Sequence, residues 1–325
     1  MRLTLLAVPV LMIFAWISGA FGDRLMDRAY VLNAGNNTVT VIDTAKNEAL
    51  ITWRSGLIPA GAAINTASGK AYITNAHHSD SSVSVIDIES NSLLETVTVG
   101  KEPTGIAINP GANKAYVACS AEGLVSVIDM TTNKVTNTIK TGSGSFDVNI
   151  IDNKIFVTNS NDNTVSVIDG VSEKIIKTVK TGKVPLGIAI SHPVKMAYVV
   201  NLGENSVTVI NTATDSALTT IPVGKKPWKA AADPVNNKVF VTNRMGNTVS
   251  VIDVKSNKVT DTINVGKEPM GVSVNSGTGR AYVANYADST ISVIDIAKNK
   301  VVDTIKLSGI PDSPYHGLPW NVVAF

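Results

Sequence analysis

Short apolar segments with alternating polar positions recur along the chain from residue 29 to the C-terminus. One type reads Ala-Tyr-Val-x-Asn, as at 197–201, and another reads Thr-Val-Ser-Val-Ile-Asp, as at 248–253. β-branched residues dominate these segments, and turn-forming clusters such as Asn-Asp-Asn at 161–163 separate them, which is typical of strands joined by tight turns. Because no segment shows a sustained apolar period of 3.6 residues, the pattern predicts strands rather than helices.

The segments belong to a unit that repeats seven times. The tripeptide Val-Ile-Asp, or a close variant, ends every 40 to 44 residues, at Asp43, Asp87, Asp129, Asp169, Asn211, Asp253 and Asp295. Each unit has four segments, from Pro-x-Gly-Ile-Ala-Ile, as at 103–108, to Lys-Val-x-x-Thr-Ile, as at 134–139. A four-stranded meander at this interval is the signature of a β-propeller blade. The sequence therefore predicts an all-β, seven-bladed β-propeller with four-stranded antiparallel blades.

The order of the segments predicts how the ring closes. The chain enters the repeat at 29–33, on the second segment of a unit, and ends at 319–325, on a segment of the first type. We therefore expect the C-terminal strand to join the first blade, which removes the open seam between first and last units.

The first 22 residues differ from the repeats. Arg2 precedes a nearly unbroken apolar run, 3–17, and Ala20-Phe21-Gly22 offers small residues for cleavage before Asp23. We interpret 1–22 as a secretory signal peptide and 23–325 as the propeller domain. An uncleaved membrane anchor is the alternative, because a span needs about 20 apolar residues. The protein is thus expected to be secreted, periplasmic or on the cell surface, and to contact a membrane only if the segment stays uncleaved.

The repeat units resemble the YVTN-type β-propeller family, which is named for a Tyr-Val-Thr-Asn signature. The signature reads Ala-Tyr-Ile-Thr-Asn at 71–75, Ile-Phe-Val-Thr-Asn at 155–159 and Val-Phe-Val-Thr-Asn at 239–243. The resemblance covers essentially all of 23–325, and looks most like archaeal surface-layer propellers and bacterial periplasmic proteins of this repeat class. It implies the fold but no particular activity, because propellers host unrelated functions.

Composition and charge narrow the classes of function. Charged residues make up 17% of the chain and the net charge is +2 at pH 7, which gives no global signature of nucleic-acid binding. The single cysteine, Cys119, cannot form an internal disulfide or a cysteine-based zinc or iron–sulfur site. No nucleophile elbow, HExxH helix or phosphate loop occurs. We therefore favour a non-enzymatic binding or scaffold protein over an enzyme.

The meander also sorts the regular residues and loops. Alternate connections lie at the same end of a blade, so the loops between second and third strands share one face, the upper face, with the blade-to-blade crossovers. We expect the Asp of Val-Ile-Asp to bind turn amides and the Tyr or Phe of each signature strand to pack between blades. The glycine before a crossover, as at Gly182, is expected to supply a special backbone angle.

Departures from the repeat point to a ligand-binding surface on the upper face. The residue after a crossover proline should edge the central opening, and it is bulky at Trp228, Met270 and Trp320. The last crossover, 309–319, is unusually long, and irregular loops on a rigid scaffold often carry function. The hypothesis assigns this surface to an envelope protein, a glycan or a small molecule. Its residues are Trp228, Arg244, Met270, Tyr286, Tyr315, His316 and Trp320. Plugging of the tunnel mouth and sealing of the ring closure are the alternatives.

Two further hypotheses use upper-face residues. His77, His78 and Asp80 lie in the upper loop of the blade next to His316, and convergence of these groups would bind zinc or copper, in a metal-binding protein or a metal-dependent lyase or lactonase. Crossover lysines form a partial basic ring that would favour nucleic acid, although nearby glutamates and the low net charge disfavour it. The ring comprises Lys101, Lys183, Lys225, Lys226, Lys229 and Lys267.

Overall fold

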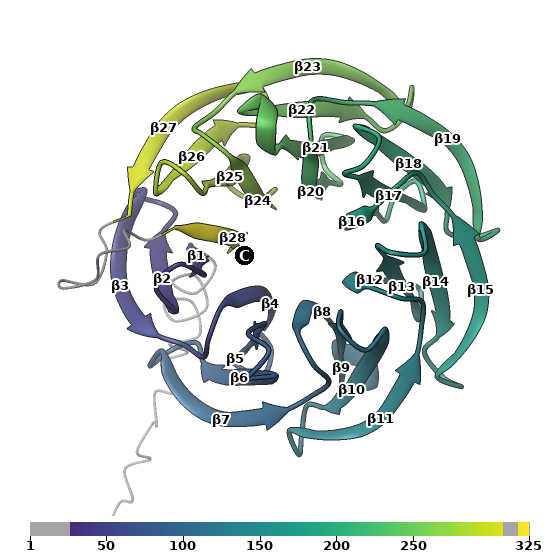
Figure 1. Ribbon diagram of the computed structural model, residues 1–325. Helices are drawn as coiled ribbons and strands as arrows, with labels where there is room; N and C mark the ends of the chain where they lie inside the picture. Colours follow the sequence, from purple (N-terminus) through teal and green to yellow (C-terminus); the bar gives the residue numbers. More distant parts are fainter. Residues whose placement is uncertain (1–26, 308–317, 325) are drawn as a thin grey trace, which may run out of the picture.

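Seven four-stranded antiparallel sheets stand around a central axis in the computed structural model (Figure 1), which describes residues 27–307 and 318–324. This arrangement confirms the predicted seven-bladed β-propeller. The proposed signal peptide and most of the 309–319 crossover, with Tyr315 and His316, lie outside the described residues.

The strands of each blade are given from the axis outward. Blade one holds β28 (Pro319–Ala324), β1 (Arg28–Asn33), β2 (Thr38–Asp43) and β3 (Glu48–Arg54). Blade two holds β4 (Pro59–Asn65), β5 (Lys70–Asn75), β6 (Ser82–Asp87) and β7 (Ser92–Thr98). Blade three holds β8 (Pro103–Asn109), β9 (Lys114–Cys119), β10 (Leu124–Asp129) and β11 (Lys134–Lys140). Blade four holds β12 (Ser145–Ile151), β13 (Lys154–Asn159), β14 (Thr164–Asp169) and β15 (Lys174–Lys180). Blade five holds β16 (Pro185–Ser191), β17 (Met196–Asn201), β18 (Ser206–Asn211) and β19 (Ser216–Pro222). Blade six holds β20 (Pro227–Asp233), β21 (Lys238–Asn243), β22 (Thr248–Asp253) and β23 (Lys258–Asn264). Blade seven holds β24 (Pro269–Asn275), β25 (Arg280–Asn285), β26 (Thr290–Asp295) and β27 (Lys300–Lys306).

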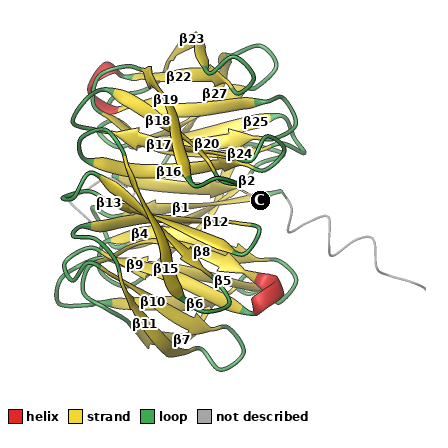
Figure 2. Cartoon of the chain, turned by 90° about the vertical axis from the view of Figure 1, so that its right-hand side faces the viewer, coloured by secondary structure: helices red, strands yellow, loops and turns green. Residues whose placement is uncertain are grey.

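Helix is confined to two short 3₁₀ turns in the part of the chain that the structure describes, η1 (Pro110–Ala112) and η2 (Arg244–Gly246), drawn red in Figure 2. Among the described residues, no helix has the length and apolar character needed to cross a membrane.

The ring closes as the segment order predicts. β28 pairs antiparallel with β1, with Tyr30 opposite Val323 and Val31 opposite Val322. Val322 is buried against residues of blade seven and blade one together. The C-terminal strand therefore supplies both the inner strand of blade one and the contact that joins the two ends of the repeat.

The core lies between the blades. The second and third strands are buried on both faces because each blade is covered by its two neighbours, whereas the outermost strands are exposed along most of their length. The signature Tyr or Phe is fully buried in every blade, as predicted. In four of the five blades that carry tyrosine, its hydroxyl bonds the next blade, and Tyr198 donates to Asn257 Oδ1 at 3.1 Å. The hydroxyl of Tyr116 is buried without a hydrogen-bond partner among the described residues. Hydrophobic burial between neighbours is therefore the main stabilising interaction of the fold.

The Asp of Val-Ile-Asp binds the amides of the turn that follows it, as expected. Asp129 Oδ1 accepts from Thr131 N at 2.9 Å and from Thr132 N at 2.8 Å. In blade five, Asn211 Oδ1 accepts the same two bonds from Ala213 N and Thr214 N. The turn therefore needs an oxygen acceptor at this position, and the negative charge is not essential.

The signature Thr and Asn tie the inner strand to its neighbours. Thr242 Oγ1 accepts from Lys229 N at 3.1 Å and donates to Met270 O of the next blade at 2.7 Å. Asn243 Nδ2 donates to Thr248 Oγ1 at 3.0 Å and to Ser250 Oγ at 2.9 Å. The Thr-Asn pair thus fixes the start of the inner strand and the upper loop at once.

The expected role of the crossover glycines needs correction. Positive φ angles fall on the residue before the proline, such as Glu102, Val184 and Glu268, and not on Gly182 or its equivalents. A Cβ on Gly182 would lie 2.7 Å from Asn201 Nδ2. Glycine is therefore needed for space beside the signature asparagine rather than for its backbone angle.

Replacing Asn243 with alanine should destabilise the protein by about 1–3 kcal/mol, because two buried hydroxyls lose their donor. Urea unfolding of Asn243→Ala beside Asn264→Ala, an exposed position on β23, measures the effect. Equal stability of the two variants would contradict this role for the signature asparagine.

Acid should weaken the fold through the turn aspartates. At Asp87, Asp129 and Asp169, the backbone amide three residues on is the main cause that lowers the pKa below the ordinary 3.8. A lowered folded-state pKa stabilises the fold above the unfolded pKa, and this contribution is lost as pH falls through the folded-state pKa. We expect a constant Tm down to about pH 4 and a steep fall below it.

Changing these three aspartates to asparagine, the residue that blade five already uses, provides the matched control. The amide acceptor remains but no longer titrates, so the acid-induced fall in Tm should become shallower. An unchanged acid profile in the triple variant would show that other groups govern it.

Candidate functional site

A bulge at the start of each inner strand builds the site. In blade six, Pro227 pairs with Asn243 and Ala230 with Val241, so Trp228 and Lys229 stand opposite one residue of β21. The same shift occurs at the start of every inner strand. Bulges change the direction in which side chains point. Each blade therefore presents two bulge residues at the axis. The first borders the upper mouth of the central opening, and the second faces the space beneath it.

Aromatic rings from blades four, six, seven and one close the upper mouth. Trp228 packs edge-to-face on Phe146, with ring centroids 6.1 Å apart, and on Trp320, at 5.6 Å. Tyr286 packs on the other side of Trp320, at 6.5 Å. Beneath the rings, a space of only about 10 Å³ remains. These four residues, here called the aromatic cap, plug the mouth and leave their upper edges half-exposed.

Arg244 adds a cation to the aromatic cap. Its guanidinium carbon lies 5.5 Å from the centroid of the Trp228 ring, and its Nη2 and Nε donate to Glu268 Oε2 at 2.7 and 3.1 Å. Arg244 N also bonds the crossover through Lys226 O. The side chain is therefore held over the indole by a cation–π contact and an ion pair.

The structure brings together four of the predicted ligand-binding residues, Trp228, Arg244, Tyr286 and Trp320. It leaves Met270 away from the surface, because only 1% of that side chain is exposed. Phe146, which holds the same position in the one crossover without a proline, joins the cluster instead. Tyr315 and His316 lie outside the described residues, so their part in the surface stays a prediction.

A cavity of about 330 Å³ lies on the axis below the aromatic cap. It extends along the inner strands to the lower turn that carries His192. Many of its lining residues are Ala, Val and Ile of the inner strands, but the surface that they and the polar residues expose to it is mainly polar. We call this cavity the channel.

Three polar residues enter the channel where the repeat normally has glycine. The second bulge position reads Gly61, Gly105, Asp147, Gly187, Lys229, Gly271 and Asn321 from blade two round to blade one. A Cβ on Gly105 would lie 2.6 Å from Asp147 Cα, and one on Gly187 would lie 2.8 Å from Lys229 Cα. A Cβ on Gly271 would lie 2.5 Å from Asn321 Cα. Each polar residue therefore depends on a glycine in the preceding blade.

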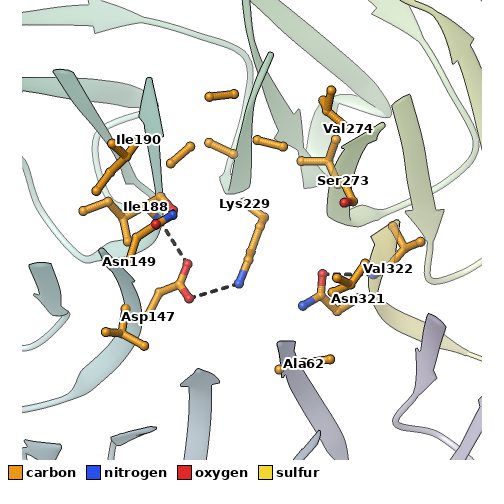
Figure 3. A pocket seen from close by; sticks show the side chains of 18 of the residues that line it. Ala62, Asp147, Asn149, Ile188, Ile190, Lys229, Ser273, Val274, Asn321 and Val322 are labelled. Carbon is orange, nitrogen blue, oxygen red and sulfur yellow. Dashed lines mark hydrogen bonds and ion pairs between the residues drawn. The ribbon is translucent and has the colours of Figure 1, made fainter. Parts of the chain in front are cut away.

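Asp147 and Lys229 form an ion pair inside the ring (Figure 3), although they are 82 residues apart in sequence. Lys229 Nζ lies 3.1 Å from Asp147 Oδ1, with 21% and 6% of the two side chains exposed. Asp147 Oδ2 accepts from Ile188 N at 3.0 Å. Lys229 therefore does not belong to the upper lysine ring, because its side chain points into the channel.

The sequence reasoning missed Asp147 and Asn321. The available signal was the loss of glycine at the second bulge position, which aligning the seven inner strands makes visible. A bulky residue directly after the proline, one position earlier, is a stronger sequence signal than the exchange of a single glycine.

The histidine cluster has a structural arrangement of its own. The His77 and His78 rings lie 4.1 Å apart, and His77 Nδ1 bonds Ser79 Oγ at 2.7 Å. Asp80 accepts hydrogen bonds from Leu57 N and from Ser82 Oγ, so its carboxylate fixes the loop to the crossover. Within the described residues, no three His, Cys, Asp or Glu side chains are placed to hold a metal ion. The zinc or copper hypothesis depends on His316 and stays a prediction, as does nucleic-acid binding by the remaining lysines.

The fold is shared with solved structures of proteins that carry very different names. Kuenenia stuttgartiensis hydrazine synthase is 20% identical, with 83% of this chain and 92% of that chain covered and a TM-score of 0.74. A functionally unknown protein from Desulfotomaculum acetoxidans is 14% identical, with 91% and 98% covered and a TM-score of 0.76. AztD from Citrobacter koseri, solved in its apo form, is 16% identical, with 92% and 97% covered and a TM-score of 0.63. At this identity the likeness shows the propeller fold alone. No family model and no curated protein matches the sequence.

Removing one partner of the ion pair should lower the stability of the protein, and placing the usual glycine at both positions should restore it. Lys229→Met leaves the buried Asp147 carboxylate without its cation and should lower the free energy of unfolding by about 2 kcal/mol, given the partial exposure of the lysine. The double variant Asp147→Gly and Lys229→Gly should be more stable than Lys229→Met. Urea unfolding measures the free energy of unfolding of both variants. A double variant that is less stable than Lys229→Met would contradict the prediction.

Proposed function

We propose that this chain is an exported, non-enzymatic binding propeller of the YVTN repeat class, which engages a protein partner in the periplasm or at the cell surface through its aromatic cap. The observation that carries the proposal is the half-exposed cluster of Trp228, Trp320 and Tyr286 with Arg244 fixed against it. The apolar segment at 3–17, which follows Arg2 in the pattern of a signal peptide, supports export.

The chemistry of the aromatic cap favours a protein over a glycan. Trp, Tyr and Arg are the residues most enriched among those that dominate protein interfaces. The rings pack edge-to-face, and Arg244 lies over Trp228, so the broad ring faces on which a sugar would stack are used within the cluster. Exposed lysines of the crossovers, including Lys183, Lys225 and Lys267, surround this patch. The partner therefore has an apolar centre with an acidic rim.

Export and binding are tested separately. Fractionation of the native host should place the chain outside the cytoplasm, with an N-terminus at Asp23 by mass spectrometry. A full-length chain in the cytoplasm would overturn the proposed location.

For binding, Arg244→Ala combined with Tyr286→Ser should lose a partner that the unchanged protein retains from envelope extracts, as measured by quantitative cross-linking. The control is Val171→Ala with Leu218→Ala, which removes exposed apolar groups away from the aromatic cap. Equal retention by both double variants would reject the aromatic cap as the docking surface. Retention of polysaccharide in place of protein would identify the glycan alternative.

A further inference from the structure

The channel is separate from the proposed docking surface. The aromatic cap leaves about 10 Å³ beneath its rings, whereas the channel holds about 330 Å³ and reaches His192 in a lower turn. A small molecule would therefore enter from the lower face. Pockets for small ligands have volumes from about 300 Å³ upward, and a few precisely placed polar groups orient the ligand.

The ion pair at the closed end is not needed to build the ring. Four of the seven blades carry glycine at the same position, so the bulge forms without any side chain there. Withdrawing two charges from water costs several kcal/mol per ion before their attraction repays it, so an ion pair is not an obvious way to stabilise a channel. The three exchanges also occur in blades four, six and one, each after a glycine that makes room for it. The arrangement is therefore built to bring polar groups to the axis.

The hydrogen bonds of Asn321, Lys229 and Asp147 show which of these side chains are available to a ligand. Asn321 Nδ2 donates to Ala60 O at 3.1 Å and its Oδ1 accepts from Val322 N at 2.9 Å, so this amide fastens the closing strand. Lys229 has three donors, of which Asp147 receives one among residues 27–307 and 318–324. Asp147 accepts one bond at each oxygen and has further acceptor capacity.

The electrostatics select the class of ligand. One cation and one anion stand side by side, so the closed end of the channel is a dipole with no net charge. A ligand with a single charge would be buried without full compensation, whereas a zwitterion would place an opposite charge against each partner. Beyond the pair, residues such as Ile188, Ile190 and Val272 are almost fully buried in the cores between blades, so the surface open to a ligand is mainly polar.

We propose that the channel binds a small zwitterion, of the kind represented by free α-amino acids. The ligand carboxylate accepts from Lys229 Nζ and its ammonium donates to Asp147. No bond is made or broken, and the site is a binding site only. This inference stands independently of the proposed function, because the two sites are on opposite sides of the aromatic cap.

Isothermal titration of the purified protein with L-valine and L-leucine tests the proposal. Isovalerate and isobutylamine, which keep the valine side chain but lack one charged group, are the matched ligands. We expect saturable binding of at least one amino acid, and affinity for isovalerate and isobutylamine lower by about ten- to a hundredfold, because each lacks one charge-assisted hydrogen bond.

Variants locate the binding. Lys229→Met should weaken amino-acid binding by about tenfold or more, and Asp147→Gly with Lys229→Gly should abolish it while keeping the fold, because glycine is the usual residue there. Lys183→Met, which removes an exposed lysine on the upper face, should leave affinity unchanged. Circular dichroism confirms that each variant is folded.

Three results would overturn the proposal. In the first, millimolar valine or leucine gives no heat of binding and no rise in Tm. In the second, isovalerate binds as tightly as valine. In the third, the folded double-glycine variant binds the amino acid with unchanged affinity. None of them bears on the aromatic cap, whose partner is lost or retained in a different experiment with different variants.

Discussion

Each blade is stable only because its neighbours cover both of its faces. The second and third strands are buried along most of their length, and the signature Tyr or Phe inserts between adjacent sheets in every repeat. A row of such blades leaves two apolar faces open at its ends, so the chain must close into a ring. The C-terminal strand achieves this by pairing with β1 and packing against blade seven at the same time. The seven-fold repeat, the rigid upper loops and the axial channel all depend on that closure.

Closure crowds the axis, and the crowding governs where function can lie. At the second bulge position, a side chain in one blade needs a glycine in the blade before it, as Gly187 is before Lys229. A ring of seven can accommodate three such exchanges without placing two of them in adjacent blades, and this chain has three. Signature threonines hold the bulges in place by bonding the amide of one blade and the carbonyl of the next. The scaffold therefore supplies a rigid frame in which a few exchanged residues converge.

The two residues of each bulge divide the axis into an aromatic layer and a polar layer. The first residue supplies Phe146, Trp228 and Trp320, which seal the upper mouth, and the second supplies Asp147, Lys229 and Asn321. The seal shields the ion pair from solvent on one side, which strengthens its electrostatic interaction with anything that enters from the other. One local backbone feature thus creates a candidate docking surface and a separate candidate pocket.

Much of the fold could be predicted from the sequence, because the information is local and repeated. Alternating β-branched residues, turn clusters and the spacing of Val-Ile-Asp determine the strands, the blades and their number, and the order of segments determines the closure. The same reasoning found Trp228, Trp320, Arg244 and Tyr286, since bulk at the mouth follows from position in the unit.

Only the tertiary structure decided which side chains meet. Met270 follows the same rule as Trp228 yet is buried, and Lys229 seemed part of a surface ring until the bulge turned it toward Asp147, 82 residues away. Sequence spacing gives each residue its blade and its height along the axis. The direction of its side chain and the room available to it depend on the bulge geometry and on the neighbouring blade, and these are interactions between residues far apart in the chain.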